Sequence, residues 1–193
     1  MNRQEVEKLA DAGVFRGQVL NGELLETHSS WIILSGKNAF KIKKPVKYSF
    51  LDFSTLEFRK AACLRELSLN QRFTDIYLSV IPISLIDGDW ELDQRGGAVV
   101  DYAVWMKRLA GYKQMDRLLE RQKVQPPDIR ALAQTVASFH QHAEVVKEPF
   151  DLETAEQTFR DLLSIELFVS ENLGSEYQMV LLQSTEWKLM LGN

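Results

Sequence analysis

The sequence predicts an α+β fold in which a small antiparallel sheet packs with one long helix and is followed by further helices. Three observations predict it. Two short β-prone runs, residues 31–34 and 39–43, flank a turn that contains Gly36 and Asn38, which is the pattern of a hairpin. Residues 54–73 have the spacing of an amphipathic helix. From residue 115 onward the apolar residues recur at helical spacing.

The composition is that of an ordinary globular protein. The chain has 193 residues, of which 45% are hydrophobic and 26% charged. A net charge of −4 argues against a dedicated nucleic-acid binder, which would be strongly basic. The single cysteine excludes an internal disulfide. No apolar run approaches membrane-spanning length, so we expect no membrane partner, and the simplest compartment is the cytoplasm.

The remaining elements follow from local patterns along the chain. A first helix is expected over residues 4–12 and a first strand over 24–26. A strand over 77–83 should have an edge or a bulge at Pro82, and Asp87-Gly88 indicates a turn. The β-branched and aromatic run 98–106 indicates another strand. Further helices are expected over residues 115–119, 126–143, 151–173 and 176–191. We interpret His140, on the apolar face of the second of these, as a core histidine.

The second strand of the hairpin has lysine side chains on one of its faces. Side chains alternate along a strand, so Ala39, Lys41 and Lys43 share one face while Phe40 and Ile42 share the other. A lysine run is usually a solvated surface. The alternation with apolar residues distinguishes Lys41 from the surrounding lysines.

The helix over residues 54–73 carries a glutamate within its apolar stripe. Ser54 and Glu57 fit a capping box at its start. Glu66 falls between the stripe residues, which are Ala62, Cys63, Leu69 and Phe73. A buried carboxylate needs a cation, and the strand face that carries Lys41 is the nearest source. The alternative is that Glu66 borders the stripe and is solvated.

Four segments resemble a known family. They are 26–31 (Glu-Thr-His-Ser-Ser-Trp), 39–46 (Ala-Phe-Lys-Ile-Lys-Lys-Pro-Val), 50–54 (Phe-Leu-Asp-Phe-Ser) and 66–72 (Glu-Leu-Ser-Leu-Asn-Gln-Arg). They are similar to a bacterial family of aminoglycoside-phosphotransferase-like proteins, which have the protein-kinase-like fold. These are small-molecule kinases of mostly unassigned substrate, often fused to a carboxy-terminal P-loop ATPase domain. The resemblance covers roughly residues 20–145.

The resemblance implies a nucleotide site in an amino-terminal lobe, residues 1–110. Lys41 would hold the α- and β-phosphates of ATP, Glu66 would orient Lys41, and Ala39 would lie against adenine. Lys43 is the alternative phosphate lysine, although the residue two before it is Lys41, which suits an adenine pocket poorly.

Two further segments complete the implied site. The loop with Ser29 and Ser30 would cover the phosphates, although it lacks the glycines that many kinases have there. Met106 would lie at the back of the pocket, and the hinge, 107–109, would contribute Arg108 and Leu109.

The catalytic part of the implied enzyme is missing from the sequence. No His-Gly-Asp-x-x-x-x-Asn loop and no metal-binding Asp follow, and the nearest string, Phe159-Arg160-Asp161-Leu162, fits a helix better. We therefore expect residues 111–193 to be helices of an incomplete second lobe, and the chain alone to be inactive. Mg²⁺ is expected only for the complete protein, and the phosphate acceptor is an unassigned small molecule. The alternatives are a non-catalytic nucleotide-binding or protein-interaction module and, third, a purely structural domain.

Overall fold

The computed structural model describes residues 1–48, 51–94, 96–145, 147, 149 and 151–153. The chain divides into two compact units, and the first, Met1–Lys47 with Leu51–Ala143, is the one described below. The helices expected after residue 153, and Asp161 with its neighbours, lie outside the described residues.

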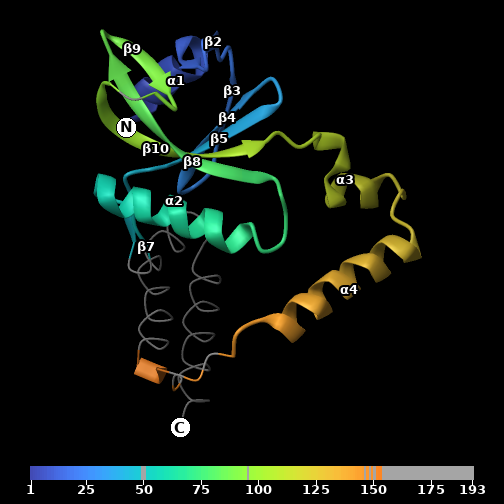
Figure 1. Ribbon diagram of the computed structural model, residues 1–193. Helices are drawn as coiled ribbons and strands as arrows, with labels where there is room; N and C mark the ends of the chain where they lie inside the picture. The colour runs from blue at the N-terminus through green and yellow to red at the C-terminus, as the bar shows by residue number, and fades with distance from the viewer. Residues whose placement is uncertain (49–50, 95, 146, 148, 150, 154–193) are drawn as a thin grey trace, which may run out of the picture. The chain divides into compact units, whose positions relative to one another are not determined.

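An eight-stranded curled sheet forms the centre of this unit (Figure 1). Its strand order is β2-β1-β9-β8-β10-β5-β4-β3. The strands are β1 (Val14–Phe15), β2 (Gln18–Val19), β3 (Glu23–Glu26), β4 (Ser30–Ser35), β5 (Asn38–Lys43), β8 (Tyr77–Ile86), β9 (Asp89–Leu92) and β10 (Ala98–Lys107). Two more short strands, β6 (Lys47–Tyr48) and β7 (Leu51–Asp52), come between β5 and the second helix. The predicted α+β class is confirmed.

The sheet is larger than the sequence predicted, and it is mixed. Strand β1 runs parallel to β9, whereas the other neighbouring strands are antiparallel. Strands β1 and β2 have two residues each, which is too short for an alternating pattern to reveal them. The predicted hairpin is present, with Gly36 at φ +53° between β4 and β5, and the predicted turn at Asp87 and Gly88, both with positive φ, joins β8 to β9.

Strand β8 is not an edge strand, because it lies between β9 and β10. The sheet tolerates Pro82 for a local reason. The pairing of β8 with β9 begins only at Ile83, the residue after Pro82. The carbonyl of Pro82 accepts a hydrogen bond from the N–H of Asp93 (3.0 Å). The side of Pro82 that lacks an N–H therefore faces the point where β9 ends.

Helix α1 (Arg3–Ala12) covers one face of the sheet. It begins at the N-cap Asn2, which forms a capping box with Glu5. Its inward residues pack with the alternate residues of β4 and β5 in the main apolar core, which includes Val6, Leu9, Trp31, Ile33, Phe40 and Ile42. This face is the apolar one that the alternation in β5 predicted.

Helix α2 (Leu56–Asn70) lies on the opposite face, against β8 and β10 (Figure 1). Two details of the prediction were wrong. The N-cap is Thr55, whose hydroxyl accepts from the N–H of Phe58 (3.2 Å), because Ser54 donates instead to Asp52. The stripe also ends earlier than expected, since Leu69 and Phe73 are exposed and only Arg59 and Cys63 are buried.

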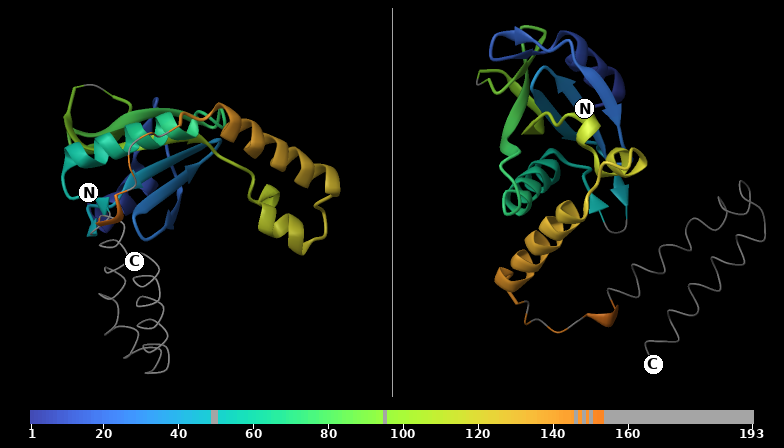
Figure 2. Two further views of the ribbon diagram at one scale, coloured as in Figure 1. Left: turned by 90° about the horizontal axis from the view of Figure 1, so that it is seen from below. Right: turned by 90° about the vertical axis from the view of Figure 1, so that its right-hand side faces the viewer.

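Helices α3 (Met115–Glu120) and α4 (Pro126–His142) extend away from the sheet (Figure 2). A single 3₁₀ turn, Gly111–Lys113, precedes them. Neither helix contains a buried residue in the described part of the chain. The expected helical face of α4 exists but is exposed, and His140 is also exposed, so its interpretation as a core histidine was wrong. None of the described helices is long and apolar enough to cross a membrane.

Candidate functional site

Helix α2 and strand β5 meet through three charged side chains. Lys41 Nζ lies 2.8 Å from Glu66 Oε1, and Lys43 Nζ contacts Glu66 Oε2. The side chain of Glu66 is only 13% exposed. The prediction that Lys41 and Glu66 form an ion pair is therefore confirmed, and the solvated alternative for Glu66 was wrong. What the sequence did not predict is that both lysines bind the same carboxylate.

The two lysines keep Glu66 ionised. Burial by itself would raise the pKa of Glu66, but hydrogen bonds from Lys41 and Lys43, with their positive charges, lower it below its ordinary value. Two ammonium groups and one carboxylate leave the cluster with one positive charge in excess. An anion that reached the exposed side of this cluster would be attracted to it.

A second ion pair anchors the other end of α2. Arg59 Nε lies 2.9 Å from Asp101 Oδ1 on β10, and both side chains are almost fully buried. The guanidinium also donates to the carbonyl of Phe53, and the ammonium of Met1 contacts the other oxygen of Asp101. Sequence reasoning missed this pair. The signal was a lone aspartate in an otherwise apolar strand.

The loop between β3 and β4 is closed by its own hydrogen bonds. The N–H of Ser30 donates to Thr27 Oγ1 (3.1 Å), and the hydroxyl and N–H of Thr27 both donate to the carbonyl of Ser30. Ser30 is fully buried, and its hydroxyl has no partner among the described residues. Ser29 is partly exposed and is the more accessible of the two predicted loop residues.

Ala39 and Met106 are directly opposite each other in the sheet. The register pairs Met106 with Ala39 and Val104 with Lys41, so these side chains share the face that also carries Lys43. Ala39 and Val104 are buried, and Met106 is partly buried. The small apolar surface beside Lys41 thus consists of residues from two adjacent strands.

The segment after β10 is held to the β4–β5 hairpin. The N–H of Arg108 donates to the carbonyl of Lys37 (2.8 Å), and its guanidinium lies 3.2 Å from Glu23 Oε2. Leu109 is 66% exposed, and its N–H has no partner among the described residues. Of the two predicted hinge residues, Leu109 therefore has a free backbone donor. A groove of about 420 Å³ lies here, lined by Gly36, Lys37, Lys107, Arg108, Leu109 and Ala110.

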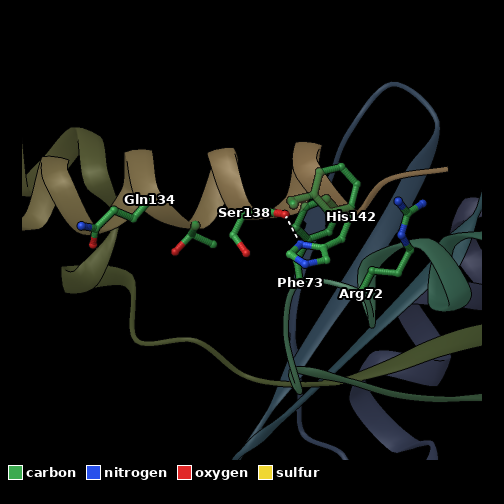
Figure 3. Close-up of a pocket in the computed structure, with 7 residues that line it drawn as sticks. Arg72, Phe73, Gln134, Ser138 and His142 are labelled. Carbon is green, nitrogen blue, oxygen red and sulfur yellow. Dashed lines mark hydrogen bonds between the residues drawn. The ribbon is translucent and has the colours of Figure 1, made fainter. Parts of the chain in front are cut away.

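A larger groove, of about 700 Å³, lies elsewhere, beside helix α4 (Figure 3). The ring of Phe139 stacks against that of Phe73, with centroids 4.2 Å apart, and Arg72 lies over Phe139. His142 Nδ1 is 2.7 Å from the carbonyl of Ser138. The groove is open and contains no ion pair between the residues that line it, so we place the candidate site at Lys41 and Glu66 instead.

The described residues contain no group of three or more His, Cys, Asp or Glu side chains that could hold a metal ion. The charged cluster on β5 and α2 has one carboxylate and two ammonium groups, so it suits an anion and does not suit a cation.

Comparisons with known proteins give relatives but no family. No family model matches the chain, and no solved structure matches it. Uncharacterized proteins of Mycobacterium tuberculosis (strain H37Rv) and Mycobacterium bovis are each 36% identical to it over 126 residues. The match covers 63% of this chain and 23% of each relative, so the chain spans about a quarter of the length of the curated relatives it matches.

Proposed function

We propose that residues 1–110 form the nucleotide-binding lobe of an ATP-dependent small-molecule phosphotransferase of the aminoglycoside-phosphotransferase-like type. The observation that carries the proposal is the ion pair between Lys41 on β5 and Glu66 on α2. In protein kinases a lysine on a strand and a glutamate on the helix that follows form such a pair, and it must be in place for phosphoryl transfer.

The topology around this pair supports the proposal. Five strands in the order β3-β4-β5-β10-β8 are antiparallel, and along the chain α2 lies between β5 and β8, after the short strands β6 and β7. The strand–turn–strand with Ala-x-Lys, followed by a helix with an inward Glu, is the arrangement on which the resemblance to kinases rests.

The cluster fits the phosphates of ATP electrostatically. The cluster has one positive charge in excess, Lys41 is its partly exposed ammonium, and Ala39 and Met106 offer an apolar surface next to it. The N–H of Leu109, which has no partner among the described residues, is the type of backbone donor that a hinge provides to adenine. In this proposal Glu66 orients Lys41, and the loop with Ser29 covers the phosphates. Mg²⁺, bound by groups outside this cluster, would supply the neutralisation of phosphate charge.

Titration of the 193-residue chain with ATP, followed by NMR shifts or calorimetry, tests the proposal. We expect weak binding, with a dissociation constant of roughly high micromolar to millimolar and hence about 4–6 kcal/mol, because one lobe supplies only part of the pocket. Lys41→Ala should abolish it, since it removes the accessible point charge.

Lys47→Ala is the matched control. Lys47 belongs to the same basic run, but its side chain is largely exposed and pairs with Asp52. It should leave the affinity unchanged. Equal losses in the two variants would indicate nonspecific attraction to the basic run. Shifts confined to residues far from 27–43 and 106–109 would exclude this site and leave the lobe as an interaction module.

A further inference from the structure

The two lysines that bind Glu66 have different environments. The side chain of Lys43 is 8% exposed and that of Lys41 is 27% exposed. The ammonium of Lys43 also lies 5.3 Å from the centre of the Phe53 ring. The loss of its carboxylate partner leaves a buried ammonium without compensation for its charge, which strongly lowers the stability of the fold. A partly exposed ammonium can be hydrated instead, so the same loss changes the stability little. The two ion pairs are therefore not interchangeable.

We propose that Lys43 is a positioning residue that holds Glu66, and with it helix α2, against β5 in the absence of nucleotide. Lys41, which Glu66 orients, is then the lysine that turns a remaining N–H of its ammonium toward a phosphate. The second statement rests on the proposed function, whereas the first does not.

The geometry supports this division of roles. Lys41 binds Oε1 of Glu66 and Lys43 binds Oε2, so movement of Lys41 leaves the contact of Lys43 in place. With a single lysine, the helix and an incoming phosphate would compete for the same ammonium. With two lysines, the helix stays docked while Lys41 binds the ligand.

Cys63 provides a direct reporter of helix docking. It is the only cysteine of the chain, it is fully buried on α2, and its Sγ lies 4.0 Å from the carbonyl of Tyr102 on β10. Burial raises the pKa of the thiol to about 12. A thiol reagent can therefore reach Cys63 only when α2 separates from the sheet.

The experiment measures the rate at which Ellman's reagent labels Cys63 in the full chain without nucleotide. Lys43→Met should raise the rate by about tenfold or more, because it leaves Glu66 with only the more exposed Lys41, whose ion pair water screens. Lys41→Met and the exposed control Lys47→Met should change it by less than about threefold. Lys43→Arg, which keeps the charge, should restore slow labelling.

Faster labelling of Cys63 in Lys43→Met would exclude the explanation that the lost charge acts only on the pKa of the thiol. The charge of Lys43 lowers the pKa of Cys63, so its removal without any opening would make the thiolate rarer and labelling slower. An equal or larger acceleration in Lys41→Met than in Lys43→Met would overturn the proposal. If Lys43→Met fails to fold, as judged by circular dichroism, acceleration beyond threefold in Lys41→Met alone would overturn it.

Addition of ATP to the wild-type chain separates the two statements. If ATP binds, as NMR shifts report, and labelling of Cys63 does not accelerate, α2 remains docked while Lys41 is engaged. Faster labelling on ATP binding would overturn the role of Lys43. If no ATP shifts occur, the proposed function fails, and the nucleotide-free rates still decide the role of Lys43.

Discussion

Helix α2 is tied to the sheet at two places that use opposite arrangements of charge. Near its amino end the helix supplies the cation, Arg59, and the sheet supplies the carboxylate, Asp101. Seven residues later the helix supplies the carboxylate, Glu66, and the sheet supplies two lysines. Both lie on the same inward face, because positions seven apart are about two turns apart on a helix.

The difference between the two places lies in access. Asp101 is fully buried, and Nη1 of Arg59 donates to the backbone carbonyls of Phe53 and Ser54. The cluster at Glu66 reaches the surface through Lys41. An ion pair closed on all sides can only hold structure, whereas one with an exposed lysine can also bind an anion. Strong pairing therefore identifies a candidate site only when it is combined with exposure.

The largest expected effect comes from breaking the closed pair. Asp101→Asn leaves the guanidinium of Arg59 buried without a carboxylate, which should lower the free energy of unfolding by about 3–5 kcal/mol. Urea denaturation followed by circular dichroism measures it. The control Asp93→Asn breaks the exposed pair with Arg16 and should cost about 0–1 kcal/mol. Similar losses in the two variants would remove the distinction between closed and open pairs.

An intermediate effect is expected when acid protonates Glu66 in its cluster with Lys41 and Lys43, which is the open cluster because Lys41 is partly exposed. The folded chain lowers the pKa of Glu66, so this group stabilises the fold above its unfolded pKa of about 4.3, and that contribution disappears as the pH falls through the lower folded value. The difference in unfolding free energy between the wild type and Glu66→Gln should be constant from about pH 8 to 5 and shrink below about pH 4.

Urea denaturation at each pH gives this difference directly. A gap that persisted unchanged at the lowest pH at which the chain is folded would mean that the charge of Glu66 is not what stabilises the helix. A gap that grew in acid would have the wrong sign for a carboxylate with a lowered pKa.

The smallest effect is expected from substitutions at the start of α2 that change neither the Arg59–Asp101 pair nor the cluster at Glu66. Thr55→Ala removes the hydroxyl that caps the helix and should cost about 1 kcal/mol of unfolding free energy. Ser54→Ala removes a hydroxyl that donates to Asp52 and does not cap the helix, so it should cost less. The reverse order of these two losses would restore Ser54 as the cap.

The Lys41–Glu66 pair could be predicted from the sequence, but the contact of Lys43 with the same carboxylate and the pair of Arg59 with Asp101 were missed. Alternation along β5 placed Lys41 and Lys43 on one face, and helical spacing placed Glu66 on the facing stripe. Each prediction used only a local period. The ion pair of Arg59 with Asp101 joins residues 42 positions apart on different elements. No local sequence pattern at either residue identifies the other as its partner.

Other errors have related causes. Leu69 and Phe73 were expected inside because apolar residues at helical spacing usually face a core, but both are exposed, and Phe73 comes after the end of α2. The same argument failed for the apolar residues of α4, which are exposed in the described part of the chain. Periodicity predicts which residues share a face, and it does not predict whether another element covers that face.

The tight turn between β4 and β5 determines which side chains meet α2. Its Gly36 has a positive φ, and the register beyond it pairs Leu34 with Ala39 and Ile32 with Lys41. Because the pleat has a period of two, one inserted residue in this turn that shifted β5 in register would exchange its two faces. Phe40 and Ile42 would then face the carboxylate, and the lysines would enter the apolar core. A change in loop length at this hairpin, with every charged residue retained, would thus remove the site as completely as mutation of all three of its members.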